Sequence, residues 1–408
     1  MPFEVPSSWV WTNVGEISQS ILYGVSKSAK SRGTYRLLRI TDIQDNTVNW
    51  NTVPFTDYED EKAEAYLLQD GDILFARTGA TVGKSYLVNN LQEKAIYASY
   101  LIRVKTNHYV LPEFVKYFFE SGFYWEQVLG NSVGIGQPNV NGTILSNLEL
   151  PIPPIMEQKR IVKELGKWLS IIDKIEESKG QLQKNISWAK SKVLDLAIHG
   201  KLVQQDPNDE PATELLKRIN PKAEITSDNG HYQKLPFKIP KSWVWCGHNN
   251  VLEISGGSQP AKNLFISVPK ANYVRLYQIR DYGENPIPVY IPEELASKRT
   301  EKGDILLARY GGSLGKVFHA ERGAYNVAMA KVIFKYPNVI FKDFAYYYYL
   351  SDLYQGRLKE ISRTAQAGFN SSDFNEMLFP LPPYEEQKRI VNVINKTFTI
   401  LDKIAVNL

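Results

Sequence analysis

The sequence predicts an α+β protein made of two copies of one module, each with a mixed or antiparallel sheet and several helices. Three observations carry this prediction. The same phrases occur twice in the same order, short runs of β-branched and aromatic residues are separated by Gly and Asp, and a stripe of apolar residues follows each copy at spacings of three and four. The stripe is typical of helices that pack on helices, so we expect two long antiparallel helices with coiled-coil packing between the modules, and a pseudo-twofold molecule.

The duplication is clearest in a phrase of twelve residues, nine of which are identical between the copies. Other phrases return in the same order. The pairs are PIPPIMEQKRIV (151–162) with PLPPYEEQKRIV (380–391), VPSSWVW (5–11) with IPKSWVW (239–245), YRLLRITDI (35–43) with VRLYQIRDY (274–282), and GDILFARTGATVGKS (71–85) with GDILLARYGGSLGKV (303–317). These pairs indicate that a whole module has been duplicated.

The repeats divide the chain into four parts. We expect a first module over 1–150, a helical spacer and linker over 151–231, a second module over 232–380, and a second, short helix over 381–408. The aromatic segments FVKYFFES (114–121) and FAYYYYLS (344–351) predict a helix packed on the sheet of each module. Stacking of these rings on nucleic-acid bases is the alternative to core packing.

The repeated phrase marks the point where each module ends and a helix begins. Its prolines favour an extended chain, and the apolar stripe starts a few residues later. In the first copy the stripe is interrupted only at Lys179, and a helix of about 40 residues would be ~60 Å long. We expect the helix–helix and subunit interface to consist of Ile161, Leu165, Trp168, Ile172, Ile175, Leu182, Ile186, Val193 and Leu196 in the first helix, and of Ile390, Ile394, Leu401 and Ile404 in the second.

Composition and charge exclude several classes of protein. The 408 residues contain one cysteine, Cys246, which rules out an intrachain disulfide and a cysteine-based metal cluster. The N-terminus shows no signal pattern and no segment is apolar enough to span a bilayer, which predicts a cytoplasmic protein. The net charge is +4, but residues 1–150 carry 12 basic and 16 acidic side chains whereas residues 232–380 carry 19 and 13. The two modules therefore differ in surface chemistry although they share one plan.

Two segments resemble enzyme motifs and depart from them. TGATVGKS (78–85) has one residue too few between its glycines for a phosphate-binding loop, and its second copy ends in Val317 instead of a hydroxyl residue. LPPY (381–384) is similar to the base-holding motif of adenine N6-methyltransferases but begins with Leu381, which cannot bond the base. We therefore expect a Gly-rich turn and a helix start at these places, and no active site, metal site or cofactor site in this chain.

The duplicated module, the repeated PxPPxxEQKRIV phrase and the central GKLVQQDPNDEPATELL (200–216) together resemble the specificity subunit of Type I restriction–modification systems. The resemblance covers essentially the whole chain. It implies that each module is a target-recognition domain that reads one half of a bipartite, asymmetric site in double-stranded DNA, and that the helices set the gap between the halves. It also implies two adenine-N6 methyltransferase subunits and restriction/translocase subunits as partners, which would bind S-adenosylmethionine, ATP and Mg²⁺ themselves.

A module that reads DNA needs Lys and Arg for phosphates, and Arg, Lys, Asn or Gln for base edges. The loop over 25–39 concentrates basic residues within a net-acidic module, and Gly-rich turns and polar loops recur in both copies. The expected DNA-binding residues are Lys27, Lys30, Arg32, Arg36, Arg39, Arg77, Lys84, Gln137 and Asn139 in the first module, and Lys262, Lys270, Arg275, Arg280, Arg309, Lys316, Gln366 and Asn370 in the second. A solvated basic loop is the alternative for 25–39, and a structural ion pair in each module is the alternative for Arg77, Lys84 and their counterparts.

Other interpretations remain open. A protein–protein scaffold of duplicated modules without DNA contact is the main alternative function, and an enzyme with cryptic motifs is another. The second stripe is about 20 residues shorter than the first, judged from the duplication. We therefore expect the distal residues Ala189, Val193 and Leu196 to lack a partner within the chain and to be covered by another protein, a methyltransferase subunit. A truncated chain is the alternative to that expectation.

Overall fold

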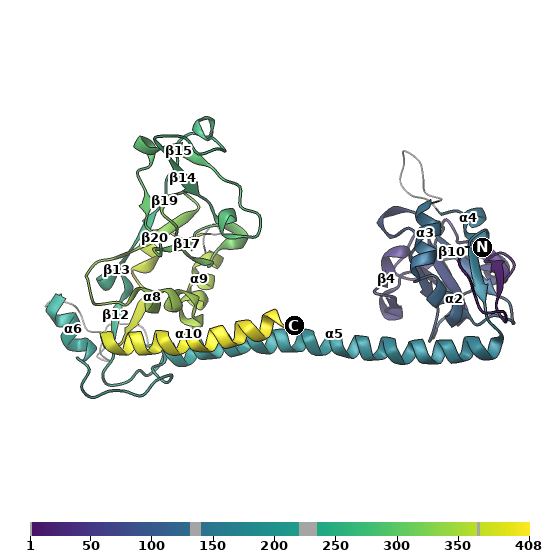
Figure 1. The fold of residues 1–408 in the computed structure, drawn as a ribbon, viewed down its shortest axis with the longest axis horizontal. Helices are drawn as coiled ribbons and strands as arrows, with labels where there is room; N and C mark the ends of the chain where they lie inside the picture. Colours follow the sequence, from purple (N-terminus) through teal and green to yellow (C-terminus); the bar gives the residue numbers. More distant parts are fainter. Residues whose placement is uncertain (1, 131–139, 220–234, 365–367) are drawn as a thin grey trace. The chain divides into compact units, whose positions relative to one another are not determined.

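The computed structural model describes residues 2–130, 140–219, 235–364 and 368–408 (Figure 1). The chain divides into two compact units, Met1–Glu176 and Glu177–Leu408. The boundary falls inside one long helix, α5 (Ile155–Ile198), so each unit contains one module and one part of this helix. Across the described ranges, no helix is both long and apolar enough to cross a membrane.

The first module is built on an antiparallel sheet with the strand order β2-β10-β7-β8. A smaller sheet with the order β6-β3-β9 is mixed, because β3 pairs antiparallel with β6 and parallel with β9. The strands are β1 (Val10–Asn13), β2 (Ser18–Tyr23), β3 (Tyr35–Leu38), β4 (Ile43–Gln44), β5 (Thr47–Val48), β6 (Phe55–Thr56), β7 (Ile73–Ala76), β8 (Ser85–Leu87), β9 (Ala95–Tyr97), β10 (Leu101–Thr106) and β11 (Glu149–Ile152), and the helices are α1 (Asp60–Ala63), α2 (Pro112–Phe118), α3 (Gly122–Gly130) and α4 (Gly142–Ser146). Strands β1 and β11 pair antiparallel, which ties the start of the module to the point where α5 begins.

The second module repeats the order of the main sheet, and its mixed sheet has one strand more. Its main sheet has the order β13-β20-β17-β18, and its mixed sheet has the order β15-β14-β19-β16. The elements are β12 (Val244–Gly247), α7 (His248–Val251), β13 (Leu252–Gly256), β14 (Tyr273–Tyr277), β15 (Tyr290–Pro292), β16 (Arg299–Thr300), β17 (Ile305–Ala308), β18 (Val317–His319), β19 (Gly323–Tyr325), β20 (Met329–Phe334), α8 (Lys342–Leu350), α9 (Asp352–Thr364) and β21 (Leu378–Leu381), and the helices α6 (Ala212–Ile219) and α10 (Tyr384–Val406) flank the module in the chain. The predicted duplication and the α+β class with mixed and antiparallel sheets are therefore confirmed.

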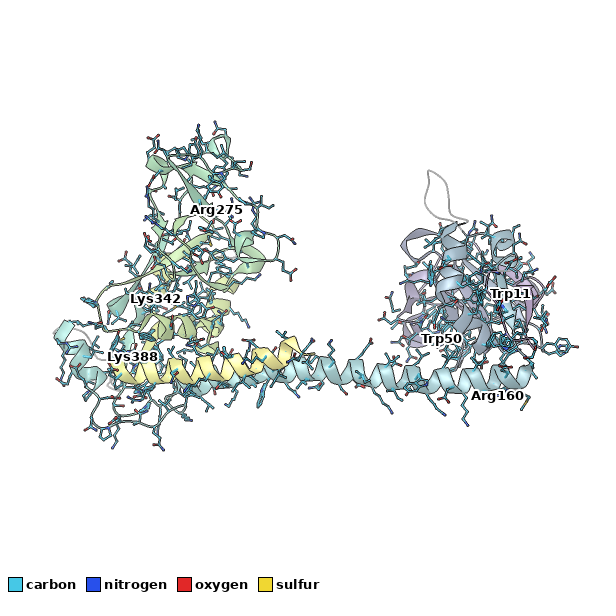
Figure 2. The ribbon with its side chains drawn as sticks, viewed as in Figure 1. Trp11, Trp50, Arg160, Arg275, Lys342 and Lys388 are labelled. Atoms are coloured by element: carbon cyan, nitrogen blue, oxygen red, sulfur yellow. The ribbon has the colours of Figure 1, made fainter. Side chains whose placement is uncertain are left out.

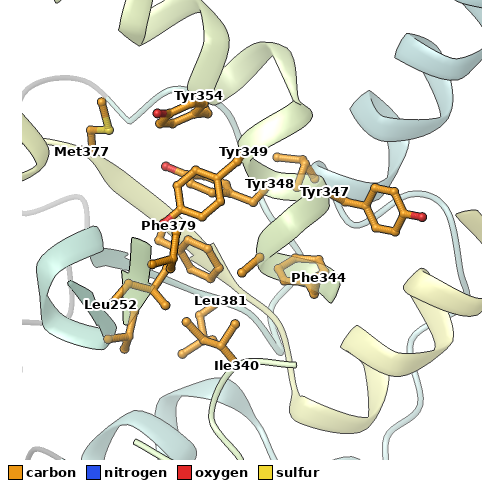
Figure 3. Packing of buried hydrophobic residues seen from close by; sticks show 14 of the residues in the cluster. Leu252, Ile340, Phe344, Tyr347, Tyr348, Tyr349, Tyr354, Met377, Phe379 and Leu381 are labelled. Atoms are coloured by element: carbon orange, nitrogen blue, oxygen red, sulfur yellow. The ribbon is translucent and has the colours of Figure 1, made fainter. Parts of the chain in front are cut away.

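The aromatic helix of the second module lies in the core, as predicted. Phe344, Tyr348 and Tyr349 of α8 are almost fully buried and pack in one cluster with Phe379 and Leu381 of β21 (Figure 3). In the first module, Phe114 and Phe119, in and just after α2, are buried in the corresponding cluster. These rings are thus part of the protein interior and are not available for stacking on bases.

Helix α10 lies antiparallel along the last part of α5 within the second unit (Figure 1). Ile390 and Ile394, near the start of α10, share a core cluster with Ile198 at the end of α5, whereas Asp402, near the end of α10, pairs with Lys190 earlier in α5 at 2.5 Å. Antiparallel pairing of long helices is confirmed for this unit.

One part of the helix prediction is wrong. Val193 packs on the core cluster of the second module, and Ala189 and Leu196 are only partly exposed. The reason is the antiparallel direction, which puts the start of the shorter helix beside the end of the longer one. The exposed members of the predicted stripe are instead Leu165, Trp168, Ile172, Ile175 and Leu182 of α5 and Ile404 of α10, while Ile186 is buried and Ile161 and Leu401 are partly buried.

The Gly-rich segments form turns between the paired strands β7–β8 and β17–β18, as predicted. Gly83 and Gly315 adopt φ values of +83° and +86°. Their carbonyl groups accept hydrogen bonds from Tyr124 Oη at 2.6 Å and from Gln355 Nε2 at 2.8 Å. Each turn is thereby anchored to a helix of its own module, α3 in the first and α9 in the second.

Candidate nucleic-acid interface

The repeated phrase builds the same joint between sheet and helix in both units. Gln158, fully buried in the first turn of α5, accepts a hydrogen bond from Leu111 N at 2.9 Å and donates to Pro153 O at 2.9 Å. Gln387 in α10 does the same with Phe341 N at 2.7 Å and Pro382 O at 3.0 Å. An amide is suited to this role because it donates and accepts at once.

A second repeated pair closes each joint. Trp9 Nε1 donates to Glu157 Oε1 at 3.2 Å, and Trp243 Nε1 donates to Glu386 Oε1 at 2.9 Å. Burial raises the pKa of the Glu386 carboxyl, against the opposing effect of its hydrogen bonds from Trp243 and Gln205. Together the Gln and Glu of the phrase fix the direction in which each helix leaves its module.

The basic loop of the first module is held rigidly at both ends. A Cβ at Gly24 would lie 2.3 Å from Tyr97 O, and a Cβ at Gly33 would lie 2.6 Å from Thr56 O, so only glycine allows this close backbone approach. Between them, Lys27 lies over the ring of Tyr58, and Lys30 pairs with Asp57 at 2.8 Å. The exposed Arg32 guanidinium has no ion-pair or hydrogen-bond partner among the residues that the structure describes. Arg32 is therefore the cation that this loop presents most freely to solvent.

Other predicted DNA contacts of the first module are engaged in the fold. Arg36 binds Glu93 with two hydrogen bonds of 2.8 and 2.9 Å, donates to Val53 O and lies over the Phe55 ring. This hydrogen bonding lowers the pKa of the Glu93 carboxyl. Arg39 pairs with Asp42 at 2.7 Å at the start of a 3₁₀ turn. Both side chains thus support the mixed sheet, and their contact with DNA stays a prediction.

In the second module, too, cations predicted to bind DNA contact acidic and aromatic side chains of the fold. Arg275 (labelled in Figure 2), which aligns with Arg36, pairs with the buried Asp281 at 3.0 Å, and its guanidinium lies over the rings of Tyr277 and Tyr290. Lys270 lies over Tyr273. Lys262 and Arg280 are exposed, and neither has a side-chain partner within the described part of the chain. Among the described side chains of this module Arg280 is an exposed guanidinium without a partner, as Arg32 is in the first module.

The cations around the Gly-rich turns fall into two groups. Arg77 lies over the ring of Tyr23, and Arg309 lies over Tyr310 and donates to Phe369 O at 3.4 Å. Among the described residues both arginines contact aromatic rings, Arg309 also contacts carbonyl groups, and neither forms the ion pair considered as the alternative. Lys84 and Lys316 are exposed at the ends of the turns and form no ion pair with any described residue.

The predicted amide contacts are only partly visible. Gln137, Asn139 and Gln366 lie outside the described residues. Asn370 is exposed, and its side chain caps the 3₁₀ turn that it precedes while its backbone N–H donates to Asp373 at 2.7 Å. The described residues contain no group of three or more His, Cys, Asp or Glu side chains placed to hold a metal ion.

Sequence reasoning missed the joint residues Gln158, Gln387, Glu157 and Glu386. The signal was present, because all four fall on identical positions of the repeated phrase. The prolines and the apolar stripe of the phrase predict where the helix begins, but they do not indicate that a glutamine in its first turn is buried. The sequence also did not predict that the aligned residues Arg36 and Arg275 have different ion-pair partners. Arg36 pairs with Glu93, which is distant in the chain, whereas Arg275 pairs with Asp281, which is six residues away.

Comparison with known proteins agrees with this architecture. The family model of the Type I restriction modification DNA specificity domain matches residues 6–184 and 240–405, once on each copy. The Type I restriction enzyme EcoEI specificity subunit of Escherichia coli is 25% identical over 66% of this chain and 57% of its own length, so this match spans less than two thirds of that relative. The EcoKI specificity subunit of Escherichia coli strain K12 is 22% identical over 98% of this chain and 84% of its own length.

A solved structure supports the fold. A chain from a structural study of complex assembly and conformational transition of the type I R-M system aligns with a TM-score of 0.71 and 19% identity, and covers 100% of this chain and 94% of its own. The family model covers most of both modules and most of each long helix. The chain belongs to the Type I restriction modification DNA specificity domain family.

Proposed function

We propose that this chain is the DNA-recognition subunit of a Type I restriction–modification complex, and that each module reads one half of a bipartite, asymmetric site. One observation carries the proposal. The main sheets of the two modules share one strand order and the joints are alike, yet the exposed cations without a partner among the described residues differ. Arg32 follows β2 in the first module, whereas Lys262 follows β13 and Arg280 follows β14 in the second. Two modules with the same main-sheet order but different exposed cations suit two half-sites of different sequence.

The helices fit a role in setting the distance between the half-sites. Helix α5 is a single element of 44 residues, about 66 Å at 1.5 Å per residue. Dimeric DNA-binding proteins fix the spacing of half-sites by the geometry of what joins their reading elements. A buried glutamine anchors each helix at its own joint, Gln158 in α5 and Gln387 in α10, and would fix the direction in which that helix leaves its module.

The exposed apolar stripe of α5 fits the docking of partner subunits. Trp168 and Ile175 are each 59% exposed, although both belong to a regular helical stripe. Large apolar side chains in a contiguous exposed row mark protein interaction sites. We propose that adenine-N6 methyltransferase subunits and restriction/translocase subunits dock on the helices, that those partners bind S-adenosylmethionine, ATP and Mg²⁺, and that this chain, as a cytoplasmic protein, contributes no catalytic residue.

Half-site-resolved DNA binding tests the reading function. The chain, assembled with its methyltransferase subunits, would be titrated onto duplexes in which one half-site at a time is randomised. Arg32→Ala should relax discrimination at one half-site and Arg280→Ala at the other, each by about tenfold if the arginine bonds a guanine edge. Equal losses on all duplexes with a flatter salt dependence would instead assign these arginines to phosphate contacts.

A matched control is available in the first module. Lys94 is exposed and lies just before the first residue of β9. The basic loop begins near the other end of β9, where Val25 pairs with Ala98. Lys94→Ala should leave both half-sites unchanged. If the assembled complex shows no sequence preference at all, the reading function is refuted and a protein–protein scaffold without DNA contact becomes the better account.

A further inference from the structure

The two joints have the same construction but differ in what covers them. Phe3 packs edge-on against Trp11 with a centroid distance of 5.0 Å, and in the second unit Phe237 packs against Trp245 at the same 5.0 Å. The Trp–Glu and Gln–backbone contacts are also repeated, as described above. The outer face of the second joint is nevertheless buried, whereas that of the first joint is open.

The cover of the second joint is the segment 199–216, which follows α5 in the chain. Gln205 Nε2 donates to Glu386 Oε1 at 2.7 Å, and Gln205 Oε1 accepts from Ser242 Oγ at 2.6 Å. Asp209 binds Arg389 through both carboxylate oxygens, at 2.6 and 3.2 Å. Asp209 is 8% exposed, so this pair is largely removed from water. Each of these contacts falls on a residue of the joint that has a counterpart in the first unit.

Apolar and backbone contacts complete this cover. His199 stacks on Phe237 with a centroid distance of 3.7 Å. Ala212 N donates to Ser242 O at 2.9 Å, and Leu215 and Leu216 of α6 join the core cluster that contains Trp243. The segment therefore recognises the joint with an amide, a carboxylate and an apolar helix face together.

The counterparts in the first unit are uncovered. Ser8, Val10 and Arg160 correspond to Ser242, Val244 and Arg389 through the repeated phrases. Val10 is 66% exposed against 4% for Val244. Arg160 is exposed near the start of α5, and no described residue forms an ion pair or hydrogen bond with its side chain (Figure 2). The first joint thus presents the groups that bind the segment in the second unit, and among the described residues no corresponding segment covers them.

We propose that the first joint is a docking site for a segment of a partner protein that has the chemistry of residues 199–216. Such a segment leaves the end of a helix and carries an amide that bonds Glu157 and Ser8. It also carries an aspartate that pairs with Arg160 and an apolar helix face that packs on Val10. Charge complementarity and the occupied copy of the site carry this assignment. A second copy of this chain is the less suitable occupant, because its own segment is already bound through Asp209 and Gln205 at its own second joint. The proposal does not depend on DNA recognition.

A labelled synthetic peptide with the sequence of residues 199–219 is the probe, titrated onto the full chain and followed by fluorescence anisotropy. We expect saturable one-to-one binding. Arg160→Glu should weaken it at least about tenfold, since it removes a bidentate charge-assisted pair and adds repulsion. A peptide carrying Asp209→Lys should bind the unaltered chain poorly and should regain affinity for the Arg160→Glu chain, which no merely destabilising effect would produce.

The matched control is Lys159→Glu, which makes the same charge change on the exposed neighbour of Arg160 and should leave peptide affinity unchanged. Absence of saturable binding up to about 1 mM peptide would overturn the proposal, and so would equal binding by the Arg160→Glu chain. Light scattering of the chain alone provides the remaining outcome: a dimer that is lost with Arg160→Glu would assign the site to a second copy and overturn the assignment to a partner protein.

Discussion

Replacement of Gln387 by Ala tests whether the buried amide holds the second module to its helix. The side chain is fully buried and accepts from Phe341 N while donating to Val339 O and Pro382 O at 2.9 and 3.0 Å. Gln387→Ala leaves one buried N–H and two buried carbonyl groups without these partners. At about 1–3 kcal/mol for an unsatisfied buried group, with partial relaxation, we expect a loss of roughly 3 kcal/mol in the free energy of unfolding of this unit.

Because the chain has two units, the assay must resolve them. Hydrogen exchange with mass-spectrometric readout along a denaturant series should show faster exchange around residues 339–344 and a lower midpoint for the second unit, with the first unit unchanged. In thermal unfolding, the transition of the second unit should fall by roughly 6–12 °C for a unit of this size. Lys388→Ala is the control, since the neighbouring Lys388 is exposed and pairs with Glu385 on the surface. A change below about 1 kcal/mol in Gln387→Ala would refute the reasoning about the joint.

Two further predictions concern pH and backbone conformation. His248 is buried, hydrogen-bonded to Tyr349 and Asn249, and burial lowers its pKa from 6.5 to about 4. The unfolded chain therefore binds the proton more strongly, so the second unit should lose up to about 3 kcal/mol of stability as the pH falls from about 6.5 to about 4, and His248→Gln should flatten this part of the stability–pH curve in denaturant titrations. Gly315→Ala should destabilise the second unit by about 1–3 kcal/mol, because φ is +86° and a Cβ would lie 2.5 Å from Gln355 Oε1, whereas Gly312→Ala, with open space around its Cβ, should change the same melting transition little.

The sequence was sufficient for features that depend on local pattern or on repetition. The prolines of 151–154 and 380–383, followed by an apolar stripe, located the starts of α5 and α10. The glycines of both turns and the buried aromatic helix were also predictable, because residue type and spacing determine each of them within a few positions of the chain.

Features that depend on partners distant in the chain were not predictable. A stripe shows which face of α5 is apolar, but not which part of that face α10 covers, so the distal end was expected to be open and is in fact packed. In the same way, Arg36 and Arg32 look equivalent in the sequence. Only the fold shows that Arg36 pairs with Glu93 and that Arg32 has no partner among the described residues.

The central claim is that this chain selects the DNA sequence at which partner subunits methylate adenine. The most direct measurement is a map of N6-methyladenine at single-base resolution in genomic DNA, compared between cells with the gene, without it, and with the gene carrying an exchanged second module. The account predicts that one interrupted motif of two short half-sites with a fixed gap loses methylation on deletion, and that the exchange alters one half-site only. If no interrupted motif changes while the methyltransferase subunits are present and active, the claim is contradicted.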